Sequence, residues 1–307
     1  MINGILNIYK EKGYTSHDVV ARLRRIAGQK KIGHTGTLDP DAEGVLPVCL
    51  GRATRICDML TDRDKTYEAV LLLGRTTDTQ DTSGTVLSEC STEGLEKEKV
   101  EACILGFLGE YDQIPPMYSA LKVNGRKLYE LAREGKTVER KSRRVVIRSI
   151  RILSMELPRV RMEVTCSKGT YIRTLCQDIG EQLEVGGCME NLLRTRVGRF
   201  RIEESIRIDA VAEAAEEGRL KELLIPLDRM FEDCRKIVID GRSASMAYNG
   251  NFFLRKHLTE PGEFLPGERC RVYDPQGRFI AVYRYDGEKR RFTLEKMFLD
   301  PEELGTD

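Results

Sequence analysis

The chain has 307 residues, of which 40% are hydrophobic and 32% are charged, and its formal net charge is +1. The length exceeds that of a typical single domain, and the composition indicates a globular protein and excludes a largely disordered chain. No apolar run is long enough to cross a bilayer, and residues 1–13 lack the apolar core of a signal peptide. We therefore expect a cytoplasmic protein that contacts no membrane.

The cysteines and histidines give no sign of a metal site. Nine cysteines are scattered without a C-x-x-C pair, and the three histidines, His17, His34 and His257, lie far apart in the sequence. Structural zinc sites need ligands at close, regular spacing. We expect no structural metal.

Two strands and two helices are predicted in the N-terminal part of the chain. Residues 4–9 read as a strand, and Thr15–Ser16 can cap an amphipathic helix that ends at Gly28. The β-branched, apolar run at 66–73 predicts another strand, and the apolar spacing in 95–108 predicts a second helix.

A further strand and helix meet near the middle of the chain. Residues 160–166 alternate between apolar and polar side chains, as a half-buried strand does. Apolar residues at helical spacing follow in 172–183. Tyr171 and Arg173 are therefore expected at a strand-to-helix junction.

The segment from Lys122 to Arg151 is strongly basic in a nearly neutral chain. It holds 11 Lys and Arg residues against 3 Glu. Such a segment can follow a phosphate backbone, although a solvated face is the simpler interpretation of charge alone.

The sequence pattern changes after about residue 235. Residues 236–240, 269–273, 278–285 and 291–299 read as strands, and Asp-Pro-Gln-Gly at 274–277 is typical of a hairpin turn. This pattern predicts a large domain over 1–235 and a small β-rich domain over 236–307.

The stretch from Gly33 to Val48 is rich in glycine and proline, which predicts an ordered loop. It starts like a calcium-binding loop, but the required Glu is replaced by Leu50. No apolar strand precedes Asp39, as it would before a phosphoryl-carrying aspartate, and no P-loop is present. Taken alone, Asp39 before Pro40 most simply caps a turn.

The same stretch resembles the G-H-T-G-x-L-D-P-x-A-x-G-x-L-P signature of the TruB family of pseudouridine synthases, whose catalytic residue is the Asp of that string. Residues 113–134 resemble the RNA-gripping insertion of the bacterial branch. Five further stretches resemble family motifs, with Glu11 at a usual Pro and Leu193 at a usual Arg: Lys10–Ser16, Lys65–Tyr67, Gly74–Gly84, Ser167–Arg173 and Leu192–Gly198.

The resemblance implies an α+β protein with the pseudouridine synthase fold, in which a mixed, mainly antiparallel sheet is flanked by helices. The catalytic domain would span 1–235, with the RNA-gripping insertion at about 113–151. Residues 236–307 would form a PUA-like C-terminal domain that binds RNA.

The implied activity is the isomerisation of uridine 55 in the tRNA T loop to pseudouridine, with a flipped-out target base. Asp39 would be the nucleophile, Arg173 would pair with its carboxylate, and Tyr67 would face the uracil and move its C5 proton. The sequence leaves open whether Asp39 attacks C6 of uracil or C1′ of ribose. The reaction requires no cofactor.

The resemblance also implies a set of RNA contacts. His34 would fill the gap left by the extruded base, Tyr171 would line the pocket, and Arg55 would meet a phosphate. The expected substrate-binding residues are His34, Tyr171, Leu192, Arg55, Lys122, Arg143 and Arg144. The partner would be the tRNA T-arm, bound by a monomer that needs no protein partner.

Two alternative functions remain open. A non-catalytic tRNA-binding or chaperone protein of this fold would keep the basic insertion without needing Asp39, Tyr67 and Arg173 together. A metal-dependent phosphotransferase would use Asp39 and Asp41 as metal ligands, and a chelator would inhibit it.

Overall fold

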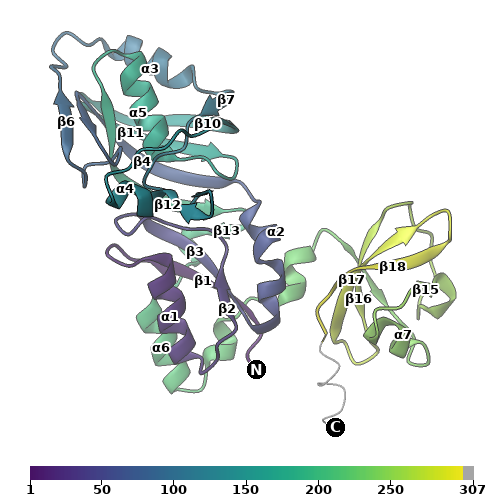
Figure 1. Cartoon of the computed structure of the whole chain (residues 1–307). Coiled ribbons are helices and arrows are strands. Elements are labelled where there is room, and N and C mark those ends of the chain that lie inside the picture. The colour runs from purple at the N-terminus through teal and green to yellow at the C-terminus, as the bar shows by residue number, and fades with distance from the viewer. Residues whose placement is uncertain (300–307) are drawn as a thin grey trace.

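A nine-stranded sheet forms most of the molecule in the computed structural model, which describes residues 1–299 (Figure 1). The strand order is β1-β3-β12-β4-β11-β10-β7, with β2 beside β3 and β13 beside β12. Among these strand pairs β3 and β12 run parallel and the others antiparallel. The strands are β1 (Gly4–Lys10), β2 (Ile32–His34), β3 (Glu43–Leu50), β4 (Lys65–Leu73), β7 (Gly109–Gln113), β10 (Arg143–Glu156), β11 (Arg159–Cys166), β12 (Gly187–Val197) and β13 (Phe200–Arg201).

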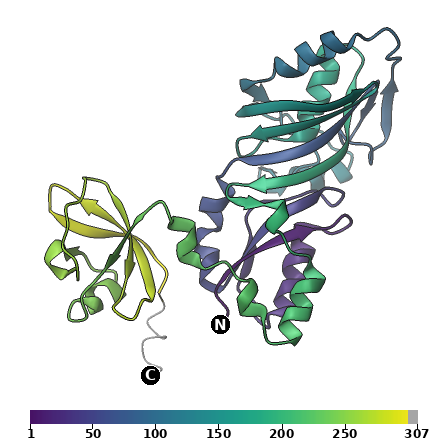
Figure 2. The ribbon, with the colours of Figure 1, turned by 180° about the vertical axis from the view of Figure 1, so that it is seen from behind.

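Two helices, α3 (Lys97–Leu105) and α5 (Ile172–Gln182), cover one face of this sheet. Helix α5 buries Ile172, Leu175 and Ile179, which lie three and four residues apart and so share one helix face. Apolar side chains of β4, β10, β11 and β12 pack against them. Seen from behind, the same strands lie in front of α5 (Figure 2).

The other face of β4, β11 and β12 carries ion pairs between side chains of different strands. Arg161 contacts Glu68 at 2.5 Å, and Arg159 contacts Glu190 at 2.8 Å. A similar pair joins Arg151 of β10 to β11. Alternation along each strand therefore separates an apolar face from a charged one.

A second helical layer packs on the β1 end of the sheet. Helix α1 (Ser16–Ile26) and helix α6 (Ile208–Glu216) bury apolar residues against β1 and β3. Thr15 caps α1 through a reciprocal capping box with Asp18. Within residues 1–299, no helix is long and apolar enough to span a bilayer.

Residues 33–48 are only partly the loop that their composition predicted. His34 ends β2, the run from Glu43 belongs to β3, and the loop proper is limited to residues 35–42. The Pro47 carbonyl accepts from Thr35 N–H at 3.1 Å, on the side where β2 ends. The missing N–H of Pro47 faces the same side and not β1, so β3 tolerates the proline. The buried apolar side chains of β3 outweighed the breaker signal.

The basic insertion is also shorter than predicted. Residues 143–156 form β10, which pairs with β7 and β11 inside the central sheet. The part outside the sheet covers residues 114–142. It contains the hairpin β8 (Lys122–Val123) and β9 (Arg126–Lys127), followed by helix α4 (Leu128–Arg133). The arginines of β10 hid the strand because they occupy its exposed positions.

Three smaller elements complete the larger part of the chain. They are α2 (Cys57–Thr61) and the hairpin of β5 (Arg75–Thr77) with β6 (Val86–Glu89).

The C-terminal residues form a separate sheet of order β14-β16-β17-β18-β15. Its elements are β14 (Arg235–Val238), α7 (Ala244–Tyr248), β15 (Phe253–Leu254), β16 (Arg269–Tyr273), β17 (Phe279–Asp286) and β18 (Arg291–Met297). Phe231, Phe279 and Phe298 pack together in a cluster that also contains Ile5 and Val45 of the larger sheet. The predicted domain boundary at 235/236 stays a prediction, and 300–307 lie outside the described residues.

Gly44 allows β3 to approach β12 closely, and this approach can be tested. A Cβ built on Gly44 would lie 2.2 Å from the backbone oxygen of Arg194, and its φ is +107°. We expect Gly44→Ala to lower the free energy of unfolding by about 1–3 kcal/mol more than Gly94→Ala does. Gly94 is exposed, has φ +78° and has open space around it, so it serves as the control for backbone strain alone. Urea titrations of both variants measure the difference, and equal losses would contradict the collision.

Candidate active site

Hydrogen bonds from several sides hold the backbone of the loop at 35–42, which contains Asp39. Leu38 N–H donates to Ser16 Oγ at 2.9 Å, which ties the loop to the first residue of α1. The Lys10 ammonium, fully buried, donates to the carbonyls of Tyr14 at 2.7 Å and of Pro40 at 3.1 Å. The backbone on both sides of Asp39 is therefore fixed, while the Asp39 side chain remains 40% exposed.

Arg173 forms the central ion pair of the site. Its Nε lies 2.9 Å from Asp39 Oδ2, and its side chain is only 5% exposed. Its Nη1 donates to the Thr79 carbonyl and its Nη2 to the Tyr118 carbonyl, both at 2.8 Å. Because three different nitrogens have separate acceptors, the orientation of the guanidinium is fixed relative to Asp39.

A second carboxylate, Asp81, stands 3.7 Å from Arg173 Nε. Its Oδ1 accepts hydrogen bonds from Thr79 Oγ1 at 2.7 Å, and from the backbone N–H and Oγ of Ser83 at 3.0 and 2.6 Å. Sequence analysis predicted no individual role for Asp81. The available signal was its place in the stretch Gly74–Gly84.

Tyr67 lies in the buried core beside the loop. It projects from β4 into the apolar cluster that also contains Leu38, Ala42 and Leu192. Burial raises the pKa of the Tyr67 phenol, and a hydrogen bond and the positive charge of Arg194 oppose this rise. The structure thus brings Asp39, Tyr67, Arg173 and the predicted Leu192 into one region.

Arg194 of β12 was not singled out from the sequence. It is almost completely buried, and its Nε donates to the Val45 carbonyl at 2.7 Å. Its Nη1 donates to the Thr37 carbonyl at 3.2 Å and its Nη2 to the Gly36 carbonyl at 3.5 Å. These acceptors lie on both sides of Asp39 in the sequence.

His34 lies at the start of the loop at 35–42. The Nδ1 of His34 accepts from Gly36 N–H at 3.3 Å, and its ring meets His17 edge-on at 5.6 Å between centroids. Burial, followed by the charges of His17 and Arg194, lowers the pKa of His34, so its ring is neutral at physiological pH.

Tyr171 precedes α5, and its backbone is clamped by Gln113 at the end of β7. The Tyr171 N–H donates to Gln113 Oε1 at 2.8 Å, and its carbonyl accepts from Gln113 Nε2 at 3.0 Å. Burial raises the pKa of the Tyr171 phenol. The predicted strand-to-helix junction therefore places Tyr171 two residues from Arg173, at the start of the same helix.

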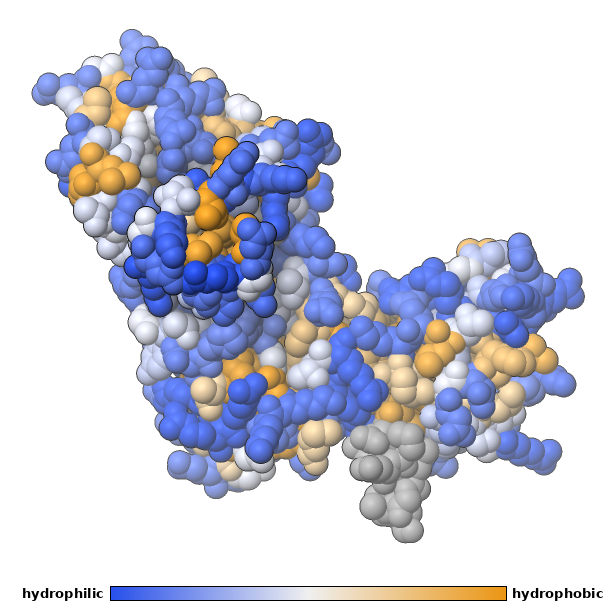
Figure 3. All heavy atoms as spheres, in the orientation of Figure 1, coloured by the Kyte–Doolittle hydropathy of each residue, from blue (hydrophilic) through white to orange (hydrophobic). Residues whose placement is uncertain are grey.

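Two of the predicted basic contacts line a surface pocket of about 290 Å³ in the insertion. The pocket walls include Lys122 and Arg143, with Arg140 and Lys141 beside them. Apolar residues, among them Leu128, and the acidic Glu139 form the rest of the lining. Where Figure 1 draws α4, Figure 3 shows apolar surface ringed by hydrophilic residues.

Arg144 and Arg55 have other partners. Arg144 contacts the carboxylates of Asp112 at 3.2 Å and Glu110 at 3.5 Å, so its charge is locally compensated. Arg55 donates to the Met297 carbonyl at 2.8 Å. The loop at 35–42 precedes β3, whereas Arg55 lies after the opposite end of β3. The structure therefore does not bring Arg55 to Asp39.

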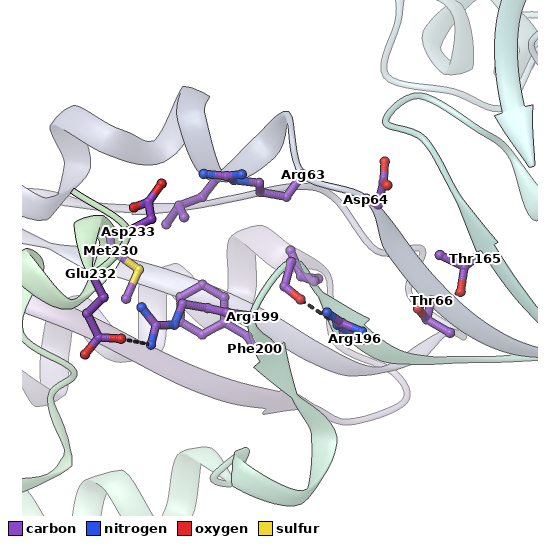
Figure 4. A pocket seen from close by; sticks show the side chains of 13 residues that line it. Arg63, Asp64, Thr66, Thr165, Arg196, Arg199, Phe200, Met230, Glu232 and Asp233 are labelled. Carbon is purple, nitrogen blue, oxygen red and sulfur yellow. Dashed lines mark hydrogen bonds and ion pairs between the residues drawn. The ribbon is translucent and has the colours of Figure 1, made fainter. Parts of the chain in front are cut away.

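A larger pocket of about 590 Å³ lies on the opposite face of the sheet (Figure 4). Thr66 lines it, and Thr66 points away from the side occupied by its neighbour Tyr67 because side chains alternate along a strand. Thr165, Arg196 and Arg199 also line it. This pocket is separate from the residues around Asp39.

Within residues 1–299, no group of three or more His, Cys, Asp or Glu side chains is arranged to hold a metal ion.

The buried ammonium of Lys10 should make stability depend on pH. Burial lowers the pKa of Lys10 to about 8, against about 10.4 in an unfolded chain. Between these values the unfolded chain binds the extra proton, so the free energy of unfolding contributed by this group rises with pH. We expect the difference in unfolding free energy, protein minus Lys10→Met, to increase from pH 8 to pH 10. Urea titrations measure it, with Lys12→Met as an exposed control, and a falling difference would contradict the assignment.

Comparisons with known proteins identify the family of this chain. Residues 24–172 match the TruB family pseudouridylate synthase N-terminal domain, and residues 173–232 match the tRNA pseudouridylate synthase B C-terminal domain. The protein named tRNA pseudouridine synthase B of Lachnoclostridium phytofermentans is 51% identical over 97% of this chain and 100% of its own length. That of Bacillus pumilus is 42% identical over 92% of this chain and 93% of its own.

Solved structures show the same fold. A Cbf5-Nop10-Gar1 complex contains a chain that is 26% identical, with a TM-score of 0.70 over 97% of this chain and 86% of that one. An H/ACA RNP bound to a substrate RNA containing 2′-deoxyuridine gives 24% identity and a TM-score of 0.70, over 97% and 85%. The expected α+β pseudouridine synthase fold with a β-rich C-terminal part is confirmed. This chain belongs to the TruB family of pseudouridylate synthases.

Proposed function

We propose that this protein converts uridine 55 in the T loop of tRNA to pseudouridine, with Asp39 as the nucleophile. The observation that carries the proposal is the ion pair of 2.9 Å between Asp39 and the buried Arg173. Relatives of nearly full length that are named tRNA pseudouridine synthase B support tRNA as the substrate.

The reaction breaks the bond between N1 of uracil and C1′ of ribose, turns the base, and joins C1′ to C5. The proton on C5 leaves and N1 gains one, so no atoms or electrons are added. A carboxylate is ionised at neutral pH and attacks without a general base, which suits Asp39 to C6 or to C1′.

Arg173 holds this carboxylate in one orientation. Its other two hydrogen bonds go to backbone carbonyls, so the guanidinium does not follow the carboxylate when substrate enters. Orientation of this kind contributes to catalysis by holding the reacting atoms in an attack geometry.

Tyr67 accepts the C5 proton in this proposal. Its ring offers an apolar face to the uracil, and Leu192 lies in the same buried cluster as a second wall. Burial raises the pKa of the Tyr67 phenol, and the positive charge of Arg194 opposes this rise, which brings the phenol closer to the ionised form that accepts a proton.

The target base must leave its stack before it reaches Asp39, which costs a few kcal/mol. His34 takes the vacated place, and its neutral ring suits stacking against bases. Tyr171 lines the pocket beside Arg173.

The insertion and the C-terminal sheet provide RNA contacts outside the pocket. Lys122 and Arg143 line a basic hollow that meets phosphates of the T-arm. On the C-terminal sheet, the ring of Phe252 is 49% exposed and lies 4.6 Å from the guanidinium of Arg291, a platform on which a base stacks. The protein acts on tRNA as a monomer.

Asp39→Asn should retain the fold and tRNA affinity but lose turnover, because the amide is not a nucleophile. Release of the C5 hydrogen from labelled tRNA reports turnover, and filter binding reports affinity. Asp41→Asn is the matched control, since Asp41 is an exposed acid of the same loop. Near-normal release by Asp39→Asn would reject the nucleophile. A protein that binds tRNA without releasing the hydrogen would instead be a non-catalytic tRNA-binding protein.

Arg143→Gln and Arg144→Gln should differ in their effect on tRNA binding. Arg143 lines the basic hollow, whereas Arg144 is neutralised by two carboxylates. We expect Arg143→Gln to weaken binding and to reduce the slope of log affinity against log salt by about one. Arg144→Gln should change both less. Binding isotherms at three salt concentrations measure the slopes, and equal effects of the two variants would contradict the assignment.

A further inference from the structure

We propose that Arg194 is a positioning residue of the reaction, which holds the Asp39 loop and the Tyr67 phenol at a fixed separation. The inference rests on the proposed function and adds to it a residue that touches neither substrate nor product.

Arg194 reaches two segments that carry the reacting groups. Gly36 and Thr37 precede Asp39 by three and two residues, and their carbonyls accept from Nη2 and Nη1 of the guanidinium. Val45, whose carbonyl accepts from Nε, lies in β3 just after the loop. One planar group thus spans the entry and the exit of the loop.

The same guanidinium contacts the group proposed to take up the proton. In the sheet, Arg194 is the cross-strand partner of Tyr67, and the positive charge of its guanidinium acts on the Tyr67 phenol. A shift of this side chain would therefore change the position of the loop relative to the phenol.

The burial of the Arg194 guanidinium costs free energy, and within the described residues no ion pair offsets this cost. Among the ion pairs of residues 1–299, none involves Arg194, and Asp39 is the carboxylate whose charge acts on it. Isolated buried cations destabilise a fold, and apolar residues of similar volume often replace buried charges without loss of stability. A cation here is therefore better explained by the site than by the stability of the core.

The backbone around Arg194 is shaped for this contact. β12 pairs with β3 through Leu193 opposite Glu43 and Arg194 opposite Gly44. Gly44 has no Cβ, so β3 comes close enough for Val45 to accept from the side chain of Arg194. On the other side of Asp39, the buried Lys10 holds Pro40 in the same way.

Arg194→Lys tests the proposal while keeping the positive charge. An ammonium cannot meet three carbonyls and a phenol with the planar fork of a guanidinium. We expect the single-turnover rate on tRNA to fall about 100-fold, the loss that a displacement of about 1 Å causes in a catalytic group. The affinity for tRNA should stay within about threefold, and thermal unfolding should show a folded protein.

The pH dependence separates positioning from a packing defect. Lysines buried in this region, Lys10 and Lys65, have pKa values lowered by burial to about 8. The lysine introduced by Arg194→Lys should also have a lowered pKa, and it should lose its proton as the pH rises from about 7.5 to 9.5. The rate of Arg194→Lys, divided by that of the unchanged protein, should therefore fall further over this range. The ratio cancels the titration of Lys10, which is present in both proteins.

Arg196→Lys is the matched control. Arg196 lies on the same strand, is exposed on the opposite face, and donates to the Gly198 carbonyl. It should leave the rate unchanged at every pH. A rate for Arg194→Lys within threefold of normal at all pH values would overturn the proposal, as would an equal loss of affinity and rate. If the unchanged protein itself released no C5 hydrogen, the proposed function would fail, and this failure is distinguishable from that of Arg194.

Discussion

Buried cations that donate to backbone carbonyls are the constraint on which this site depends. Lys10 and Arg194 donate to carbonyl oxygens in and beside the loop at 35–42, while Arg173 donates to the Thr79 and Tyr118 carbonyls and pairs with Asp39. A loop loses conformational entropy when it is ordered, and the hydrogen bonds of Lys10 and Arg194 offset this loss. The carboxylate of Asp39 is the negative charge that the cations share. The same buried cations therefore order the loop and determine the charge of the site.

The fold could be predicted from the sequence where side chains alternate or repeat at helical spacing. The strand at β11, the helix α5 and the cap of α1 were read from local patterns, and the structure has them. β3 and β10 were missed because tertiary context overrode the local signal. Pro47 looked like a breaker, and the arginines of β10 looked like an insertion, until pairing with neighbouring strands determined both.

The sequence predicted only those residues of the candidate site that a family motif singles out. Asp39, Tyr67 and Arg173 were expected from the family resemblance, and the roles given to them stay predictions. Asp81 and Arg194 could not be assigned from the sequence, because their importance lies in contacts with residues more than 90 positions away. Arg55 and Arg144 illustrate the reverse, since their charge suggested phosphates but their nearest partners belong to the protein.

The ion pairs on the open face of the sheet have a consequence for how the molecule meets a polyanion. On that face Arg151, Arg159 and Arg161 each form an ion pair with a glutamate of another strand of the sheet. The potential of closely spaced opposite charges decays within a few ångströms and is screened further by salt. A polyanion that meets these pairs therefore gains little electrostatic energy from them, although the arginine side chains still cover the strands.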